Sequence, residues 1–449
     1  MNITDQDSIK KIEDLLLNRI RGIDWMYWDF NLSIDIGSKD PFLSFDEIED
    51  FFKVIEVDYL GNTSLAEGAT EPSSQKILKV ILSLLKAKPA VLNNAIKRLF
   101  DTNDIGNNSS AHEGRMGKLN EKDRRRRRKK FQKKVRNGHR SDSSNTVIFA
   151  EGDSWFQFPR ITRWYDAVRD VIDWLIKEDE YAVYSIAAGG DWFSNIFYAG
   201  EYIEELPKIQ PDVFLISGGG NDLVGGERMA IMTLNPGHNN QNLRDLETGR
   251  IQQLIERRVN SLKQRKHLIL DVDKYQRGLK FISDEFFQFI NIYFVQYFVF
   301  LFSLSSHKNY KDMIIITQGY DYAIPQDGSQ AFIISIQRLV NWFAKTGNWL
   351  CRPLQMKGII DQNDQAAIMY AMITEFNEML IQLAKSPLLK NLYHIDCRGV
   401  AESPKDWYDE LHLKSRCYKK IARAIKDCIR DNQSQNGKGK QKIYQAKRY

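Results

Sequence analysis

TVIFAEGDSW, residues 146–155, is the stretch that decides how this chain folds. Its first five residues form an apolar run that is typical of a short buried strand. Gly152 permits a tight exit from that strand, and Ser154 stands on the turn that follows. A serine hydroxyl is a poor nucleophile unless a base removes its proton. The stretch therefore predicts where a site would lie but predicts no activity by itself.

Apolar runs of similar length recur along the chain after this first strand and alternate with helical stretches. The further predicted strands are 181–186, 212–217, 312–317 and 392–396, and the predicted helices are 161–177, 192–206, 281–304, 329–386 and 414–430. Strands alternating with helices indicate a parallel sheet covered on both faces. We therefore expect an α/β fold, a three-layer α/β/α arrangement around a five-stranded, mainly parallel sheet. In such folds ligands bind beyond the carboxyl ends of the strands.

Three further segments with chemistry-bearing residues follow predicted strands or lie near the C-terminus. Gly189 and Gly190 follow the second strand and expose backbone N–H groups, and Asn221 ends a glycine run after the third strand. His412 has Asp409 three residues before it, so the carboxylate can turn back and accept the imidazole N–H. That contact sets the tautomer and leaves the other ring nitrogen free to accept a serine proton.

Together these segments resemble the SGNH, or GDSL-type, hydrolase superfamily over roughly residues 146–430. The order of the four blocks matches, with 36 residues from Ser154 to Gly190 and 31 more to Asn221. The resemblance implies a flavodoxin-like fold, Ser154 as nucleophile, His412 as base and Asp409 as its orienting carboxylate. It also implies that Gly190 and Asn221 donate to the oxyanion, and that neither a metal nor a cofactor is needed.

The chain departs from the family pattern at three places. Trp155 stands where the family commonly has Leu, and residues 185–188 lack the Asn that usually precedes the functional glycine. Gly190 is therefore the first choice for the oxyanion donor, with Gly189 as the alternative. The chain also has 188 residues between Asn221 and Asp409. We interpret the excess, at about 223–280 and 325–385, as insertions that build a lid or a substrate groove.

The function expected from the resemblance is hydrolysis of carboxylic esters, as in esterases and lipases, through an acyl-enzyme intermediate. Two alternatives stay open. The same residues would serve a polysaccharide O-acetyl esterase or acetyltransferase acting on a glycan. A catalytically silent scaffold that binds membranes or nucleic acid is the other. The expected substrate is a small-molecule, lipid or glycan ester, and the sequence does not indicate the oligomeric state.

The regions outside 146–430 differ from it in composition. Residues 1–100 show helical spacing of apolar residues and are expected to be a helical region of unknown role. Residues 101–145 are polar and strongly basic, which favours a linker or an exposed helix with a mobile flank. The basic segment 118–140 is expected to be a solvated charged surface, with peripheral membrane or polyanion contact as the alternative. Residues 431–449 are expected to be a disordered tail.

Two observations bear on the compartment. The N-terminus lacks the basic start and apolar run of a signal peptide, so we expect a cytoplasmic location, although export by another route stays open. Four cysteines in 449 residues do not make a disulfide framework.

The aromatic run 286–302 carries three amides and falls where the fold needs a covering helix. We therefore interpret it as a buried helix; a membrane-facing segment is the alternative.

Overall fold

The structure is a computed structural model. It describes residues 106–142, 145–158, 168–225, 228–235, 243–246, 249–263, 268–307, 309–326, 349–386, 388–433 and 441–448. Before residue 100 it describes four short strands, which pair antiparallel as β1 (Trp28–Asp29) with β4 (Lys88–Pro89) and as β2 (Ile55–Val57) with β3 (Thr63–Leu65). The helical stretches predicted within residues 1–100 lie outside the described residues.

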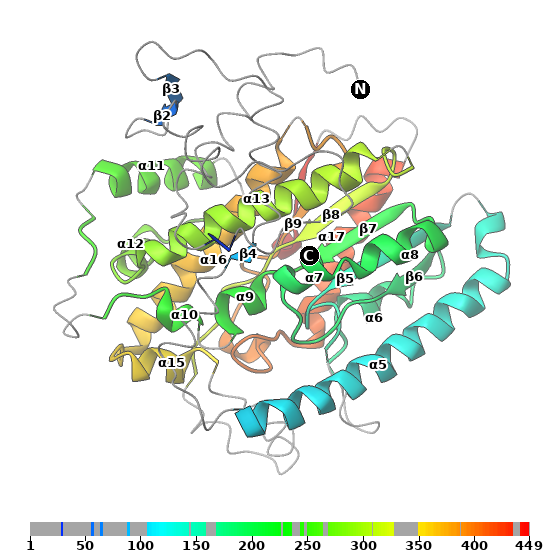
Figure 1. Ribbon diagram of the computed structural model, residues 1–449, viewed down its shortest axis with the longest axis horizontal. Helices are drawn as coiled ribbons and strands as arrows, with labels where there is room; N and C mark the ends of the chain where they lie inside the picture. Colours follow the sequence, from blue (N-terminus) through cyan, green and yellow to red (C-terminus); the bar gives the residue numbers. More distant parts are fainter. Residues whose placement is uncertain are drawn as a thin grey trace.

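A six-stranded sheet, parallel at every pairing, forms the centre of the protein (Figure 1). In spatial order its strands are β10 (Ile443–Gln445), β9 (Leu392–Asp396), β8 (Ile314–Gln318), β7 (Val213–Ser217), β5 (Thr146–Gly152) and β6 (Tyr181–Ser185). The predicted α/β class, with helices on both faces of a parallel sheet, is confirmed. The number of strands is six rather than five.

The sixth strand comes from the segment that was predicted to be a disordered tail. Residues Ile443–Gln445 pair in parallel with His394–Asp396 of β9, and the Tyr444 side chain is only 5% exposed. The prediction for 431–449 was wrong here because a three-residue strand in a polar context has no periodic signal. Its backbone groups gain partners only because the edge of β9 is available to them.

The strand order places residue 154 at a position where folds of this class bind ligands. All seven residues of β5 are buried, as expected for a strand covered on both faces. The chain leaves β5 in one direction to form β6 and then returns to the other side to form β7. The carboxyl ends of β5 and β7 therefore border the point where the strand order reverses, and a crevice forms at such a point.

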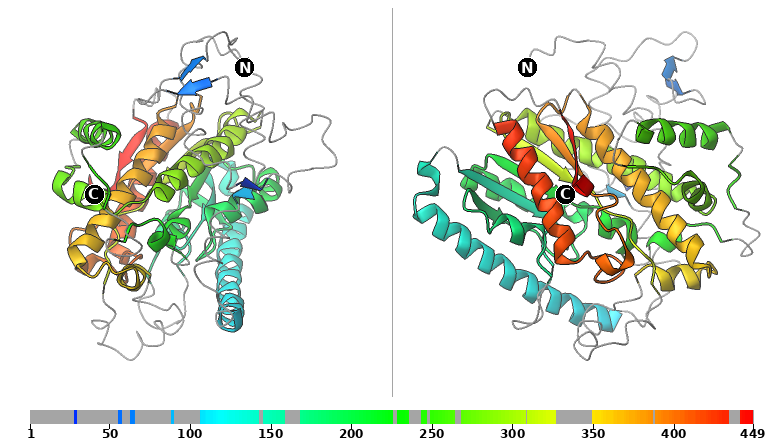
Figure 2. Two further views of the ribbon diagram at one scale, coloured as in Figure 1. Left: turned by 60° about the vertical axis from the view of Figure 1, so that its left-hand side comes forward. Right: turned by 180° about the vertical axis from the view of Figure 1, so that it is seen from behind.

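Helices cover both faces of the sheet (Figures 1 and 2). One face carries α6 (Val171–Leu175) and α17 (Ser415–Gln433), and the other carries α7 (Phe193–Ala199), α8 (Glu201–Ile209), α13 (Asp284–Ser306) and α16 (Gln362–Ala384). The predicted helix 192–206 is in fact two helices, because Gly200 between them has a φ of +63°. Of the predicted helix 161–177, residues 161–167 lie outside the described part.

The two predicted insertions contain helices that pack on this framework. They hold α9 (Gly220–Val224, beginning just before the first insertion), α10 (Arg228–Ile231), α11 (Gly249–Lys263), α12 (Val272–Leu279) and α15 (Cys351–Met356), in addition to α16. Because α16 packs against β9 and α13, much of the second insertion is a layer of the fold rather than a lid. Residues 327–348 of that insertion lie outside the described residues.

Helix α13 contains the aromatic run that raised the question of a membrane. The window Asp284–Phe302 is long and apolar enough to cross a bilayer by length and composition, but 76% of it is buried inside the protein. Tyr297 stacks on Phe193 of α7 with a distance of 3.7 Å between ring centroids. Burial in the core therefore accounts for the apolar composition of this helix.

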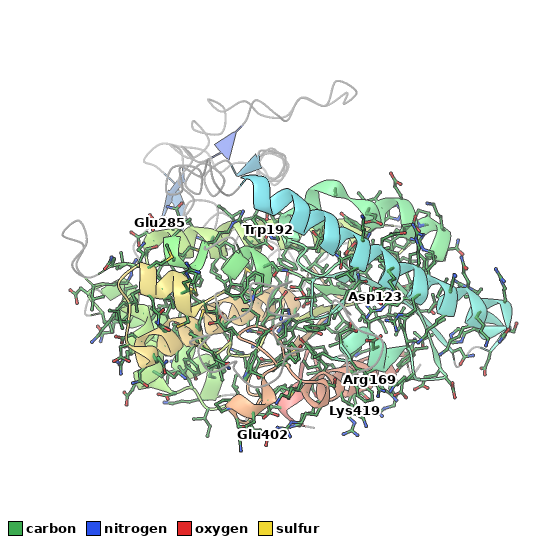
Figure 3. The ribbon with its side chains drawn as sticks, turned by 90° about the horizontal axis from the view of Figure 1, so that it is seen from below. Asp123, Arg169, Trp192, Glu285, Glu402 and Lys419 are labelled. Carbon is green, nitrogen blue, oxygen red and sulfur yellow. The ribbon has the colours of Figure 1, made fainter. Side chains whose placement is uncertain are left out.

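Residues 101–145 were predicted to be a linker or an exposed helix with a mobile flank, and most of this segment is helix α5 (Gly106–Arg136), which is followed by a short 3-10 turn (His139–Ser141). It lies along the β6 edge of the sheet, and Figure 3 shows it crossing the molecule with Asp123 labelled. Phe131 is buried and meets the Tyr184 ring edge-on at 5.3 Å. Low hydrophobicity suggested a segment that does not pack, but this helix docks through polar bonds on one face.

Candidate active site

Ser154 lies in a tight turn directly after β5. The Asp153 N–H donates to the carbonyl oxygen of Ser217 (3.0 Å), and the Gln157 N–H donates to the carbonyl oxygen of Asp153 (2.9 Å). A Cβ at Gly152 would stand 2.5 Å from the Ser217 carbonyl oxygen, so only glycine allows β5 and β7 to approach so closely. The serine is therefore held against the end of β7, with 6% of its surface exposed.

His412 joins this turn from the other end of the chain. Its Nε2 lies 2.7 Å from Ser154 Oγ, although the two residues are 258 positions apart. Its Nδ1 lies 2.9 Å from both carboxylate oxygens of Asp409. A carboxylate accepts a hydrogen bond, so the proton belongs on Nδ1 and Nε2 is left to accept the hydroxyl proton. The three side chains form one continuous hydrogen-bonded chain.

The loop that carries His412 is held in place by its own residues and by the serine turn. The backbone N–H groups of Leu411 and His412 both donate to Asp409 Oδ1 at 2.8 Å. The Trp155 indole N–H donates to the carbonyl oxygen of Leu411 (3.1 Å) and so connects the two loops directly. The ring of Phe158 meets the imidazole edge-on at 5.0 Å. The contact between serine and histidine is therefore supported from several sides.

The charges at the site favour an ionised Asp409 and a basic His412. Burial opposes the charge on Asp409, but His412 and the backbone N–H groups of Leu411 and His412 outweigh it and hold the pKa of Asp409 below its usual value. Burial also disfavours the imidazolium, yet the charge of Asp409, its hydrogen bond and the more distant Asp153 raise the pKa of His412. The arrangement can take a proton from a hydroxyl and stabilise the resulting imidazolium.

Gly190 has the features expected of a backbone donor, and Gly189 does not. The Gly189 N–H already donates to the Asn120 side-chain oxygen (3.0 Å), whereas the Gly190 N–H has no hydrogen bond to any residue in the described part of the chain. Gly190 has a φ of +84°, which favours glycine, and a Cβ there would meet only open space. The backbone N–H of Ser154 likewise has no partner among the described residues.

The Asn221 side chain faces the same region but is engaged in a contact that the sequence did not predict. Its Nδ2 donates to the carbonyl oxygen of Asp191 (2.8 Å), which ties the loop after β7 to the loop after β6. An amide nitrogen carries two hydrogens, so one remains for a ligand. Asn221 and Ser154 line one small recess, while Gly190 is not among the described residues that line it.

Two aspartates that flank these segments in the sequence have structural partners. Asp153 is buried and accepts hydrogen bonds from the Tyr320 hydroxyl and the Trp155 N–H; burial nevertheless raises the pKa of Asp153 to about 6. Asp222 accepts from the Phe193 N–H at 2.6 Å, at the first residue of α7. Both carboxylates therefore hold loops together, the structural role that Asp and Asn often have in turns.

Sequence reasoning missed Glu410, which lies between the two residues of the Asp-x-x-His pair. Its carboxylate accepts four backbone N–H groups, from Gln326, Trp349, Leu350 and Cys351, at 2.7–3.0 Å. It ties the histidine loop to the chain on both sides of residues 327–348. No local sequence pattern predicts this contact, because the partners of Glu410 are distant in sequence and donate through their backbone N–H groups.

Sequence reasoning also missed the inward face of α5, for which a signal exists. Asn120, Arg124, Arg127 and Phe131 follow one another at steps of four, three and four residues, the spacing of one helix face. Arg127 is fully buried and pairs with Asp170 at 2.5 Å, and Arg124 donates to the carbonyl oxygen of Ala187 at 3.1 Å. The spacing was overlooked because the many positive charges in this segment indicated a solvated surface.

Neither of two sequence comparisons finds a match: no protein-family model and no curated protein resembles the chain. Among solved structures, one that matches is named as a "putative GDSL-like lipase" from Parabacteroides merdae ATCC 43184. It is 9% identical, covers 62% of this chain and 94% of its own, and superposes with a TM-score of 0.29.

Within the described residues no group of three or more His, Cys, Asp or Glu side chains is placed to hold a metal ion.

Proposed function

We propose that this chain is a serine hydrolase that cleaves carboxylic esters. The observation that carries the proposal is the 2.7 Å contact between Ser154 Oγ and His412 Nε2, with Asp409 on the far side of the ring. A serine and a histidine 258 residues apart have no structural need to share a hydrogen bond at the mouth of a sheet. Proton transfer between them is what activates a serine as a nucleophile.

The reaction follows from these contacts. Ser154 Oγ attacks the ester carbonyl carbon while His412 Nε2 takes the hydroxyl proton, and Asp409 stabilises the imidazolium that forms. The tetrahedral intermediate collapses when His412 returns the proton to the leaving alcohol, which leaves an acyl group on Ser154. Water then attacks this ester with His412 as base, releases the carboxylic acid and restores the serine.

The negative charge that develops on the carbonyl oxygen needs donors. We assign them to the backbone N–H groups of Ser154 and Gly190, which have no partner among the described residues, and to the second hydrogen of the Asn221 amide. Loss of one such donor typically lowers turnover by about 100-fold to 1000-fold. Fixed donors of this kind stabilise the transition state more than the neutral ester.

The experiment is to label the full-length protein with a fluorophosphonate probe and to measure hydrolysis of p-nitrophenyl acetate. We expect Ser154→Ala to abolish both labelling and hydrolysis. Ser141→Ala, which changes an exposed serine before the start of β5 and so beyond the opposite end of that strand from Ser154, is the matched control and should behave as wild type. Equal background in wild type and Ser154→Ala would reject the hydrolase and favour the silent binding scaffold.

A further inference from the structure

A recess of about 30 Å³ opens beside Ser154. Its polar lining residues include Asp153, Ser154, Asn221 and Asp321. Much of the remaining lining is apolar: Leu223 and Val224 come from α9, and Met369 and Ile373 come from α16. A second, larger hollow on the outer side of α5 does not include the serine. Within the described part of the chain, the recess therefore offers room for a group that is bonded to Ser154 Oγ.

The position of the recess indicates which half of an ester it receives. His412 must return its proton to the leaving oxygen, so the leaving alcohol has to lie within hydrogen-bond reach of the imidazole. The described lining includes Ser154 and Asn221 but not the His412 ring, although the neighbouring Leu411 is part of it. The recess is thus on the side of the carbonyl that faces away from the leaving group, and it is left for the acyl substituent.

The size of the recess limits that substituent. A space of about 30 Å³ that is open to the centre of a water molecule holds about two water-sized groups, because one such group needs about 10–15 Å³ on this measure. Met369 is fully buried, and Leu223 and Ile373 are 1% and 3% exposed. Because these side chains are closely packed, they cannot move to enlarge the recess without disturbing the packing of the residues around them. We infer that Ser154 accepts short acyl groups, above all acetyl, so that the substrates are acetate esters; this inference rests on the proposed function.

The first test needs no variant. With p-nitrophenol as a constant leaving group, kcat/KM is measured for acetate, butyrate, hexanoate and octanoate. We expect a fall of at least about 10-fold from acetate to butyrate, because misfit of a methylene group in a pocket typically changes specificity by 10-fold to 200-fold. Octanoate hydrolysed as well as acetate would overturn the inference while leaving the hydrolase intact. No hydrolysis of any ester, with no probe labelling, would instead reject the proposed function.

The second test enlarges the recess. Met369→Ala should shift the preference from acetate towards butyrate and hexanoate, because it removes part of the wall. Met372→Ala is the matched control: the same residue type on the same helix, equally buried, but outside the recess. Ile373→Val is a milder enlargement in case the alanine variants fail to fold. Equal chain-length profiles for wild type, Met369→Ala and Ile373→Val would overturn the inference.

A different observation concerns α5, which contacts both loops that carry the site. The Asn120 amide pairs with both backbone polar groups of residue Gly189: Nδ2 donates to the Gly189 carbonyl oxygen, and the Gly189 N–H donates to Oδ1, each at 3.0 Å. Gln157, three residues after Ser154, donates to Asn120 Oδ1 at 3.1 Å. One side chain of α5 thus links the glycine loop to the serine turn.

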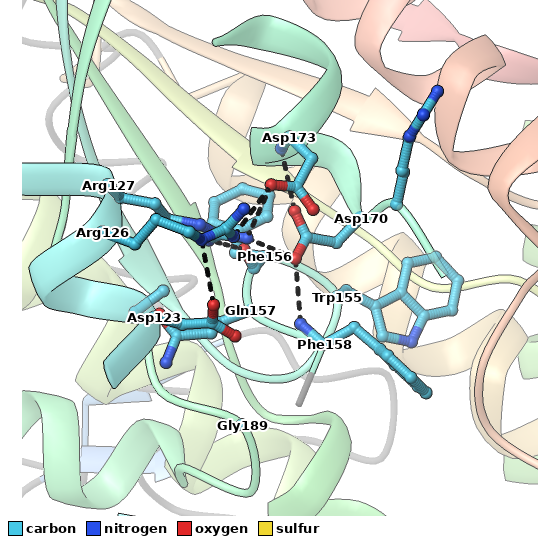
Figure 4. Close-up of polar contacts among 12 residues, drawn as sticks. Asp123, Arg126, Arg127, Trp155, Phe156, Gln157, Phe158, Asp170, Asp173 and Gly189 are labelled. Carbon is cyan, nitrogen blue, oxygen red and sulfur yellow. Dashed lines mark hydrogen bonds and ion pairs between the residues drawn. The ribbon is translucent and has the colours of Figure 1, made fainter. Parts of the chain in front are cut away.

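Two arginines of the same helix face repeat this connection. Arg124 Nε donates to the Ala187 carbonyl oxygen (3.1 Å) in the glycine loop. Arg127 Nη1 donates to the Phe156 carbonyl oxygen (2.5 Å) in the serine turn, and its other terminal nitrogen pairs with Asp170. Figure 4 shows Arg127 reaching Phe156 and Asp170. The helix holds both loops at three successive positions along its length.

We propose that Asn120 is a positioning residue for the Gly190 donor, again on the basis of the proposed function. Because the Gly189 carbonyl and the Gly190 N–H belong to one planar peptide group, the hydrogen bond from Asn120 Nδ2 to that carbonyl restrains the direction of the Gly190 N–H. Donors that are fixed before the reaction need no reorganisation when the oxyanion forms. Asn120 would therefore affect turnover without touching the substrate.

The test compares Asn120→Ala with Gln132→Ala, an exposed amide on the same helix, in the full-length protein. We expect kcat for p-nitrophenyl acetate to fall about 10-fold in Asn120→Ala, a fraction of the about 100-fold to 1000-fold lost with a whole donor. KM and the unfolding midpoint should stay near wild type. Asn120→Asp still accepts the Gly189 N–H but cannot donate to the Gly189 carbonyl, so we expect it to lose kcat as Asn120→Ala does. Equal kcat for Asn120→Ala and Gln132→Ala would overturn the proposal.

Discussion

Replacement of Arg127 by methionine tests whether the basic run is part of the folded core. The Arg127 and Asp170 side chains are both fully buried, and their atoms Nη2 and Oδ2 are 2.5 Å apart. Asp170 also accepts the backbone N–H groups of Phe158 and Asp173, each at 2.9 Å, the second at the start of α6. Methionine fills much of the same volume but leaves the Asp170 charge buried without its Arg127 partner.

The expected magnitude follows from that burial. Removing one partner of a buried ion pair typically costs about 3–5 kcal/mol, since it leaves an uncompensated charge. A domain of this size shifts its thermal midpoint by roughly 2 °C for each kcal/mol, so we expect a fall of about 6–10 °C. Arg125→Met is the matched control, because Arg125 is 72% exposed and pairs with Glu121 at the surface. Such exposed pairs are worth about 0–1 kcal/mol.

The assay is thermal unfolding of the full-length protein followed by circular dichroism at pH 7, with urea unfolding as a second measure. A further variant that combines Arg127→Met with Asp170→Asn should recover part of the loss, because the buried charge is then gone. The reasoning would be refuted if Arg127→Met and Arg125→Met lowered the midpoint by the same small amount. That result would mean that α5 does not dock on the sheet.

Three further predictions concern activity. Asp409→Asn should lower kcat by up to about 10⁴-fold, because an amide no longer enforces the proton on Nδ1 of the His412 ring; turnover within a few-fold of wild type would contradict the assigned role. Asp153→Asn should shift the acid limb of the pH–kcat/KM profile to lower pH. Activity needs neutral His412, and the charge of Asp153 raises the pKa of His412. Without that charge the ring loses its proton at lower pH. An unchanged acid limb would show that Asp153 does not affect the pKa of His412. Asn221→Ala should lower kcat about 100-fold to 1000-fold with little change in KM, as measured by steady-state kinetics, and a loss confined to KM would remove Asn221 from the oxyanion donors.

Much of the sheet could be predicted because the evidence for it is local. The five apolar runs beginning at Thr146 and ending at Asp396 became β5 to β9, since a strand covered on both faces must be apolar along its whole length. The site segments could be placed for a related reason. Ser154, Gly190 and Asn221 each follow such a strand, so parallel pairing alone brings them to one edge of the sheet.

Predictions failed where polar contacts replaced apolar periodicity. Helix α5 docks through Asn120, Arg124 and Arg127, whose partners are backbone carbonyls and carboxylates that the sequence around them does not specify. Strand β10 at Ile443–Gln445 is too short to carry a pattern and forms on an available sheet edge. The role of Glu410 was not predicted because its four hydrogen-bond donors are main-chain N–H groups, which no side-chain pattern reveals.

By itself, the sequence determined which strands are buried, in which order they occur and which side chains stand at their ends, because these properties depend on neighbouring residues. Only the tertiary structure decided that Ser154 Oγ meets His412 Nε2, and that the space beside the serine is small. It also decided that, within the described part of the chain, the N–H of Gly189 has a partner whereas that of Gly190 has none. Distances between loops, and volumes between helices, depend on the packing of residues far apart in the chain, which no local pattern encodes.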